Sequence, residues 1–415
     1  MLDVTRSADN SLAMAEHTES PEQTEFRNFC RRWLAENKPA APPFRLPLSP
    51  IEVMHEEQRA YLAAWQKKCH QAGLVGADFP KEYGGHGHKG FQAIANQEMT
   101  RAGTPYMLNV IGLSMAGPTI LVHGTEEQKR RYLPPLLSAD EIWCQGFSEP
   151  GAGSDLAGAQ ASAVRQGDHW VINGHKVWTS LAHFASWMIM LCRHDTKDKY
   201  NGLTYFIVPI ADTKGVTVRP LIKMTGETGF NEVLFEDVAV PDSLRIDAVG
   251  KGWTVAMTTL LYERGAAEGA GSGGGLSPEG LIHELVTLAK RLTRDGRPVW
   301  DDAVIRDKVM QLAVRAEGLR QTAKRMRAEG LSDHPMRLPL QAKLLVSELL
   351  QDIAGVGMEI AGPHASRYLG DPAAADGGHW PHAYMNSFGF TIAAGSNEIQ
   401  RNILGERVLG LAKSK

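Results

Sequence analysis

The chain of 415 residues has only four cysteines, at positions 30, 69, 144 and 192. They form no C-x-x-C pair and no cluster with histidine. This scarcity favours buried, reduced thiols in a cytoplasmic protein over a disulfide framework or a cysteine metal site. His86 and His88 lie close together, but no third metal ligand accompanies them. No metal site is predicted.

A strong net charge and a long apolar run are also missing. The formal net charge is −3 and 22% of the residues are charged, which argues against a broad nucleic-acid footprint. The longest apolar run, residues 110–122, contains glycine and proline and is too short to span a bilayer. The first 20 residues are polar with mixed charge, unlike a signal peptide or a basic transit helix. We predict neither nucleic-acid binding nor membrane insertion.

The hydrophobic period divides the chain, which is longer than one ordinary core requires. Residues 1–20 are expected to form a disordered tail, and residues 21–140 have a helical pattern. In residues 141–246 the period is two, and in 247–415 four or five amphipathic helices follow. We therefore predict an α+β multidomain fold: an all-α N-terminal domain, a small central β-barrel or sandwich, and a C-terminal four-helix bundle.

One turn in the β region has a specific prediction. Residues 170–172 and 175–178 are strand-like, and Asn173-Gly174 lies between them. Asn-Gly between two such segments is typical of a tight primed turn. We therefore predict a β-hairpin that reverses at these two residues.

Residues 146–155 contain three glycines, two serines and two acids. Glycines let backbone N–H groups approach a ligand closely, and hydroxyl groups can donate hydrogen bonds. About 25 residues later, Trp178-Thr179-Ser180 ends a predicted strand. A large aromatic face beside a glycine-lined wall would suit a flat cofactor such as a flavin, although many glycine-rich turns only reverse the chain.

Four motifs in this order resemble those of the acyl-CoA dehydrogenase family. They lie at residues 148–155 (Ser-Glu-Pro-Gly-Ala-Gly-Ser-Asp), 176–180 (Lys-Val-Trp-Thr-Ser), 351–357 (Gln-Asp-Ile-Ala-Gly-Val-Gly, with Ala354 where glycine is usual) and 395–402 (Gly-Ser-Asn-Glu-Ile-Gln-Arg-Asn). The similarity covers roughly residues 21–412. It implies an FAD-dependent oxidoreductase of lipid catabolism or β-oxidation, which converts an acyl-CoA to a trans-2-enoyl-CoA.

The resemblance also implies the cofactor-binding residues. The flavin would contact Gln145, Phe147, Ser148, Gly153 and Ser154 on one side, and Trp178, Thr179 and Ser180 on the other. Gln351 and Gly355 would touch the dinucleotide part of an FAD bound mainly to a neighbouring subunit. Ser396 and Glu398 would complete the site at a helix N-terminus, although an N-cap role explains Ser396 without a flavin.

One family segment is missing. Members of the family usually carry Arg-x-x-Phe-Gly early in the bundle to hold the FAD pyrophosphate, whereas residues 290–297 here read Lys-Arg-Leu-Thr-Arg-Asp-Gly-Arg. Arg291, Arg294 and Arg297 are candidates for this contact, and a solvated basic face is the alternative.

The family implies the catalytic base. Many members place a glutamate where this chain has Ala394, and others place it in the first bundle helix before an arginine, as in Glu263-Arg264 here. The resemblance therefore implies that Glu263 removes the α-proton. The backbone N–H of Ala394 would hold the thioester oxygen, and Ser154, Arg264 and Gly395 would face the acyl-CoA.

The helical pattern allows two interpretations of this glutamate. Ala256, Leu260, Glu263 and Ala267 share one helical stripe. A carboxylate on an apolar stripe loses hydration, and this raises its pKa. A glutamate at the edge of the stripe could instead turn outward to a cation, since charged residues are seldom fully buried.

The resemblance leaves partners and substrate partly open. It implies a homo-oligomer, dimer or tetramer, with a hetero-oligomer also open, and reoxidation by an electron-transferring flavoprotein. A flavin oxidase or hydroxylase is one alternative. A non-catalytic subunit sharing flavin across an interface is another, favoured by Ala394 and by the missing arginine segment. The acyl group is not determined, although members with a base in the first bundle helix include those handling branched chains.

Overall fold

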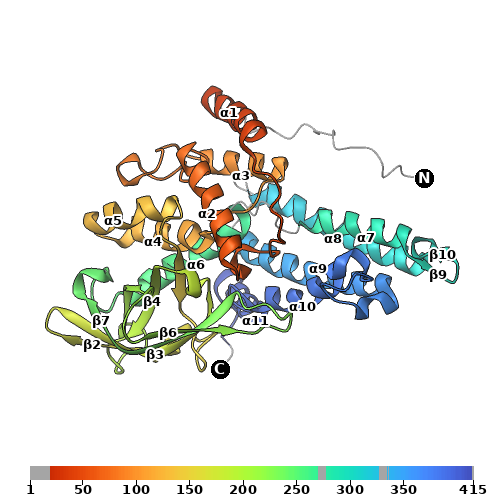
Figure 1. Cartoon of the computed structure of the whole chain (residues 1–415). Coiled ribbons are helices and arrows are strands. Elements are labelled where there is room, and N and C mark those ends of the chain that lie inside the picture. The colour runs from red at the N-terminus through yellow and green to blue at the C-terminus, as the bar shows by residue number, and fades with distance from the viewer. Residues whose placement is uncertain (1–18, 270–276, 327–333, 335, 414–415) are drawn as a thin grey trace.

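A computed structural model describes residues 19–413 except 270–276, 327–333 and 335, and it describes no side chains at 264–269 and 326. Nearly all of the tail predicted at 1–20 lies outside the described residues. The described chain confirms the predicted fold class: N-terminal helices, a central sheet and a C-terminal helical bundle (Figure 1). In the described part, no helix is both long and apolar enough to cross a membrane.

The N-terminal helices begin at side chains that cap them. Ser20 and Gln23 form a reciprocal capping box at the first helix, and Thr125 and Gln128 form another at the fifth. The helices are α1 (Pro21–Asn37), α2 (Glu56–Gln71), α3 (Phe91–Ala102), α4 (Gly117–His123) and α5 (Glu126–Leu137). Cys30, Leu34, Trp65 and Cys69 are buried together between α1 and α2. Burial raises the pKa of the Cys30 thiol to about 12, so this thiol stays protonated.

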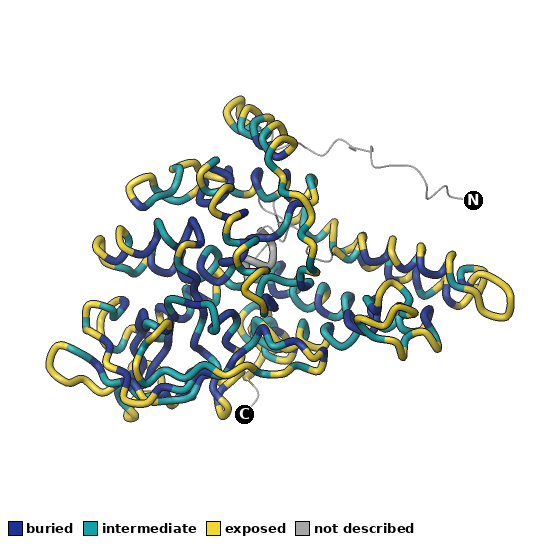
Figure 2. Tube along the Cα trace, in the orientation of Figure 1, coloured by how far each residue is buried: buried dark blue, intermediate teal, exposed yellow. Residues whose placement is uncertain are grey.

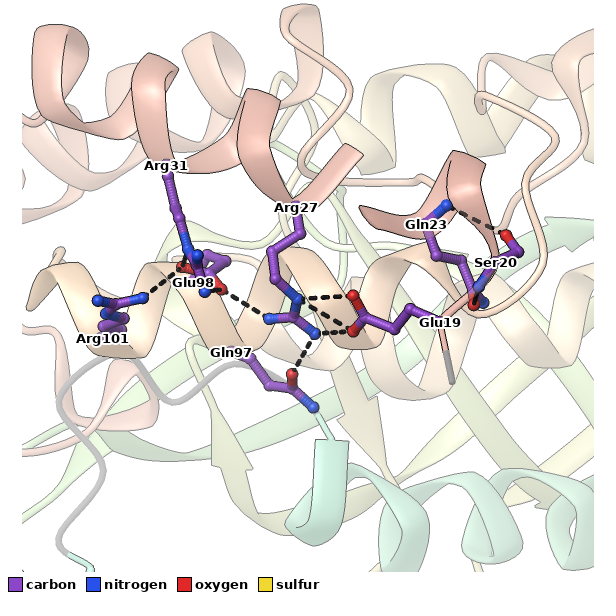
Figure 3. A network of polar contacts seen from close by, with 8 residues as sticks. All are labelled: Glu19, Ser20, Gln23, Arg27, Arg31, Gln97, Glu98 and Arg101. Carbon is purple, nitrogen blue, oxygen red and sulfur yellow. Dashed lines mark hydrogen bonds and ion pairs between the residues drawn. The ribbon is translucent and has the colours of Figure 1, made fainter. Parts of the chain in front are cut away.

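A buried carboxylate joins α1 to α3 (Figure 3). Glu98 on α3 is only 3% exposed and accepts hydrogen bonds from Arg27 (2.6 Å) and Arg31 (2.9 Å) on α1. Arg101, one turn further along α3, lies 3.9 Å away. Burial alone would raise the pKa of the Glu98 carboxyl, but the two α1 arginines outweigh this effect and lower it. The ionised carboxylate therefore holds α1 against α3.

We expect Glu98→Gln to lower the free energy of unfolding by about 2 kcal/mol. Breaking a fully buried ion pair costs about 3–5 kcal/mol, and the cost is smaller here because Arg31 and Arg101 still reach water. Urea unfolding measures the change. Glu359→Gln is the matched control, because its pair with Lys308 is exposed on both sides and should cost less than about 1 kcal/mol. Equal losses in the two variants would contradict this account.

The central domain is one twisted sheet with a core on each face. Its strands are β1 (Trp143–Gly146), β2 (Ser162–Gln166), β3 (His169–Ser180), β4 (Trp187–Arg193), β5 (Leu203–Pro209), β6 (Val216–Leu221), β7 (Phe230–Pro241) and β8 (Arg245–Ile246). They lie in the order β6-β7-β3-β2-β4-β5-β8, and β1 pairs with β4 in parallel. Side chains alternate along β4: Ile189 and Leu191 face the core shared with the helices, whereas Met188 and Met190 face the other core.

The prediction of a hairpin turn at Asn173-Gly174 is wrong. β3 continues through these residues, and the chain reverses earlier, at residues 167–168, where Gln166 pairs with His169. Asn173 instead exchanges hydrogen bonds of 3.0 and 2.8 Å with Asp237 on β7, where the register shifts by a bulge. A Cβ on Gly174 would lie 2.5 Å from that of Ala161. The Asn-Gly pair therefore serves a bulge and a close strand contact.

The C-terminal helices build a bundle around a hydrophobic core of its own. They are α6 (Gly252–Gly269), α7 (Pro278–Arg291), α8 (Ala303–Met326), α9 (Arg337–Ala361), α10 (His379–Ile392) and α11 (Asn397–Ile403). Leu285, Leu312, Leu349, Ile353 and Trp380 are buried between α7, α8, α9 and α10. Helix α6 packs instead against β5 and α4, and also touches α9. Figure 2 shows the buried stretches inside the bundle and where helices face the sheet.

All three parts of the chain meet at a buried polar junction. Glu52, in the short helix Pro50–Glu52, is 3% exposed and pairs with Lys223, which follows β6. Lys223 also donates to Asn386 on α10 (3.0 Å) and lies 3.1 Å from Glu227. Glu227 in turn lies 2.9 Å from Nε2 of His382, a fully buried residue of α10. These contacts fix the loop between β6 and β7 against both helical parts.

This junction should make the free energy of unfolding decrease as the pH falls in the acid range. Burial alone would raise the pKa of Glu227, but His382 and Lys223 outweigh it and lower the pKa from 4.5 to about 2. A depressed carboxyl pKa stabilises the fold above the unfolded value and loses that contribution as the pH falls toward the folded value. We expect the advantage of wild type over Glu227→Gln in urea unfolding to shrink by about 2 kcal/mol from pH 6 to pH 3. An advantage that is the same at both pH values would contradict the assignment.

Candidate cofactor and substrate site

The two predicted flavin-binding segments lie together in the structure. The Val177 N–H donates to the Ser148 carbonyl oxygen at 2.9 Å, and Nζ of Lys176 donates to the Phe147 carbonyl oxygen at 3.1 Å. These bonds join the segment that follows β1 to the end of β3. Gln145, Phe147 and Ser148 therefore share one region with Trp178, Thr179 and Ser180.

Two buried polar atoms in this region suit a polar ligand. Nε2 of Gln145 and Oγ1 of Thr179 are both buried, and neither has a hydrogen-bond partner among the described residues. Leaving a buried donor unsatisfied costs about 1–3 kcal/mol. A Cβ added at Gly151 or Gly153 would meet nothing within 4 Å, so there is open space beside this loop. Ser154, in the same loop, is exposed. These observations fit a ring system with hydrogen-bonding edges.

Trp178 presents an aromatic face beside these atoms. The register between β3 and β7 shifts between Lys176 and Thr179, and Trp178 takes a left-handed φ of 58°. Its side chain is 60% exposed. The ring of Phe230 packs edge-on against it, with centroids 6.0 Å apart. Such an exposed aromatic face can stack on a flat ligand.

Glu263 lies one turn beyond the buried face of α6. Val255 and Thr259 on this face are fully buried, and the Thr259 hydroxyl lies 2.9 Å from the Tyr205 hydroxyl. Glu263 itself is half-buried. Burial raises the pKa of Tyr205, the Thr259 hydrogen bond opposes this, and the nearby Glu263 carboxylate raises it again. The side chain of Arg264 lies outside the described residues.

The segment before α11 is a tight turn with fixed peptide groups. Ala394 and Gly395 both have left-handed φ angles, of 54° and 83°. Nε2 of Gln400 donates to the carbonyl oxygens of both residues, at 2.8 and 3.2 Å. Ser396 is the N-cap of α11, since its hydroxyl accepts from the Ile399 N–H at 3.4 Å. Glu398, in the first turn of this helix, is exposed.

Gln351 and Gly355 lie on the helical bundle, away from the segment after β1 and the end of β3. Both line an open cavity of about 480 Å³ on the bundle, between α8, α9 and α10. Its lining comes from these three helices, among them Lys308, Tyr384 and Phe388.

The arginines considered for the pyrophosphate contact already have protein partners or point to the surface. Residues 293–298 form a small hairpin of β9 (Thr293–Arg294) and β10 (Arg297–Pro298). Arg291 pairs with Asp376, and Arg294 donates to the Glu359 carbonyl oxygen at 2.9 Å. Arg297 is exposed. The hairpin lies at the far end of the bundle from the sheet (Figure 1).

The motifs did not reveal several residues that hold the site together. Lys176 and Glu149 form a buried ion pair of 2.7 Å, and Nδ2 of Asn231 donates to the Thr179 carbonyl oxygen at 3.1 Å. The sequence contains one signal that could have revealed the buried ion pair. Lys176 shares the buried face of β3 with Trp170 and Ile172, where an apolar residue is expected. A lysine at such a position indicates a buried partner.

Comparison with known proteins covers nearly the whole chain. It matches the family models for the acyl-CoA dehydrogenase N-terminal domain at residues 20–140, middle domain at 144–238 and C-terminal domain at 250–409. It is 36% identical to the acyl-CoA dehydrogenase IpdE1 of Mycobacterium tuberculosis, over 94% of this chain and 98% of that protein. Two solved structures, both 28% identical, cover 96% of this chain and are themselves covered completely. They are the Tcur3481-Tcur3483 steroid acyl-CoA dehydrogenase (TM-score 0.77) and the ChsE4-ChsE5 complex from Mycobacterium tuberculosis (TM-score 0.75).

Proposed function

This chain belongs to the acyl-CoA dehydrogenase family, and from that membership we propose that it converts an acyl-CoA to a trans-2-enoyl-CoA with Glu263 as the base. It is an FAD-dependent oxidoreductase acting on acyl-CoA, as the family is. The observation that carries the residue assignment is the position of Glu263. This carboxylate is half-buried beyond the apolar face of α6, and Ala394, at the other base position of the family, cannot accept a proton.

Removing the α-proton requires a base within hydrogen-bond reach and with a suitable pKa. The partial burial of Glu263 on α6 supports its assignment to this role. FAD, when bound, would supply the acceptor for the β-hydride. The chain itself orients the acyl-CoA, receives the α-proton and limits the access of water.

The turn before α11 is proposed to hold the thioester oxygen. The Ala394 N–H would donate to this oxygen, where negative charge develops as the α-proton leaves. Gln400 supports this role, because its bonds to the Ala394 and Gly395 carbonyl oxygens keep the peptide groups in one orientation. Ser154 and Arg264 are proposed to face the CoA ester.

FAD is proposed to lie against the wall formed by the β1–β2 loop and the end of β3. Gln145 and Thr179 would give it the hydrogen bonds that they lack in the protein, and Trp178 would cover a ring face. Phe147, Ser148, Gly153, Ser154 and Ser180 would complete this wall. Gln351, Gly355, Ser396 and Glu398 are proposed to contact the rest of the cofactor, the first two from the bundle cavity of another subunit.

A bulky, polycyclic acyl group is the proposed substrate class. Its support is the similarity to the Tcur3481-Tcur3483 steroid acyl-CoA dehydrogenase. Anaerobic bleaching of the bound flavin by a panel of CoA thioesters tests the proposal, with short, long, branched and steroid-type acyl groups. We expect the steroid-type thioester to reduce the flavin fastest. Faster bleaching by straight-chain thioesters would overturn the substrate class, and no bleaching by any thioester would overturn the dehydrogenase function.

An oligomer is proposed, with an electron-transferring flavoprotein as electron acceptor and the cytoplasm as location. A flavin-sharing subunit of a hetero-oligomer is a second candidate. Supporting it are the existing contacts of Arg291 and Arg294 and the similarity to the ChsE4-ChsE5 complex. Purification decides between these candidates: protein that is yellow and active alone supports a homo-oligomer. Protein that gains both properties only with a second subunit supports the flavin-sharing role.

A further inference from the structure

The buried ion pair of Lys176 and Glu149 lies next to the proposed flavin wall. We propose that Lys176 is a positioning residue, whose ammonium group fixes the backbone of Phe147 and Ser148 against the end of β3 and so sets the shape of the cofactor wall. This inference rests on the proposed function for its catalytic meaning, although its structural part can be tested without the cofactor.

Lys176 has three acceptors, two from the segment that follows β1 and one from β4. Its Nζ lies 3.1 Å from the Phe147 carbonyl oxygen, 2.7 Å from Oε1 of Glu149 and 2.9 Å from the Leu191 carbonyl oxygen on β4. The residue is completely buried. An ammonium group has three donors, so all of its hydrogen bonds are used in this one place.

Glu149 extends the anchor along the glycine-rich loop. Its carboxylate oxygens accept from the backbone N–H groups of Gln160 at 2.7 Å and Ala161 at 2.9 Å, just before β2. Its own backbone exchanges bonds of 2.9 and 3.1 Å with Ala152. Burial alone would raise the pKa of Glu149, but Lys176 and the two amides outweigh it and lower it. The Lys176–Glu149 pair therefore holds the glycine-rich loop at both ends, at Phe147 and at Gln160 and Ala161.

The location of the pair argues for a role beyond stability. Well-packed apolar residues often stabilise a core as much as a buried ion pair does. Apolar residues here would leave the Phe147 and Leu191 carbonyl oxygens without their lysine donor. Lys176 also precedes Trp178 by two residues, at the bulge that turns this side chain outward. The pair thus connects the orientation of one wall segment to that of the other.

The test compares Lys176→Met and the charge-neutral double variant Lys176→Met/Glu149→Gln with wild type. The double variant avoids leaving a buried, unpaired carboxylate, and so remains informative if the single variant fails to fold. Glu98→Gln is the matched control, because it disrupts another buried ion network in the α1–α3 layer. Three quantities are measured: amide hydrogen exchange of residues 145–149 and 176–181 in the apoprotein, the FAD dissociation constant, and the midpoint potential of bound FAD.

We expect the double variant to exchange both segments at least about tenfold faster and to bind FAD at least about tenfold more weakly. We also expect a more negative midpoint potential, since the wall's donors stabilise charge on the reduced ring. Glu98→Gln should change none of these quantities. The proposal is overturned if the double variant matches wild type, or if Glu98→Gln shows the same changes. If wild type binds no FAD, the proposed function fails, while the exchange rates still decide the role of Lys176.

Discussion

Replacement of Glu263 by glutamine should slow the reduction of bound flavin by acyl-CoA by about 10²- to 10⁴-fold, the usual contribution of a general base. Glutamine keeps the size of the side chain and its place on α6, but it cannot take up the α-proton. Because Glu263 is half-buried, the fold should tolerate this change. Anaerobic stopped-flow mixing with saturating acyl-CoA measures the rate directly.

Binding must survive for this result to identify the base. The variant should keep its yellow FAD and its affinity for the acyl-CoA, as measured by flavin absorption and by titration with the enoyl-CoA product. Glu279→Gln is a suitable control, because Glu279 is exposed in the first turn of α7. A Glu263→Gln enzyme that reduces flavin at close to the wild-type rate would show that another group removes the proton.

Adding Ala394→Glu to Glu263→Gln should restore the rate of flavin reduction by at least about tenfold, a difference of about 1.4 kcal/mol in the barrier. The restored carboxylate would occupy the other base position of the family, in the turn that Gln400 holds. Recovery should be incomplete, because the new carboxylate would extend from the turn before α11 and not from α6. Single-turnover reduction under anaerobic conditions measures the recovery.

A charge-free control separates proton transfer from a change of shape. Ala394→Gln in the same Glu263→Gln background has the same bulk and the same backbone strain, but it provides no base. It should stay as slow as Glu263→Gln alone. If the glutamine and glutamate variants recover equally, or if neither recovers, then position 394 does not reach the α-carbon and the proposed alignment of the two base positions is wrong.

The order of the structural parts could be predicted because each has its own period. The buried stripe of α6 appears in the sequence as apolar spacing, and β4 appears as a short continuous apolar run that is buried on both faces. The turn at Asn173-Gly174 could not be predicted locally, because its outcome depends on Asp237, more than 60 residues away, which binds Asn173 across the sheet. A long-range hydrogen bond thus overrides a strong local turn preference.

The motifs predicted which two segments form the candidate site, but not which of their side chains pair. The motifs at residues 148–155 and 176–180 lie together, as their similarity to one family suggested. The anchor beneath them was missed, because Lys176 and Glu149 are 27 residues apart and a motif does not indicate which charge is buried. The arginines at 291–297 had the right charge, but the β9–β10 hairpin and the Asp376 contact determine their orientation.

Exchange of the substrate's α-hydrogen tests the central claim most directly. An acyl-CoA that binds the enzyme but resists β-oxidation is incubated in D₂O, and mass spectrometry follows deuterium entering the α-carbon. Wild type should catalyse this exchange, and Glu263→Gln should reduce it to the uncatalysed rate while still binding the ligand. Deuterium entering at the wild-type rate in Glu263→Gln would contradict the account.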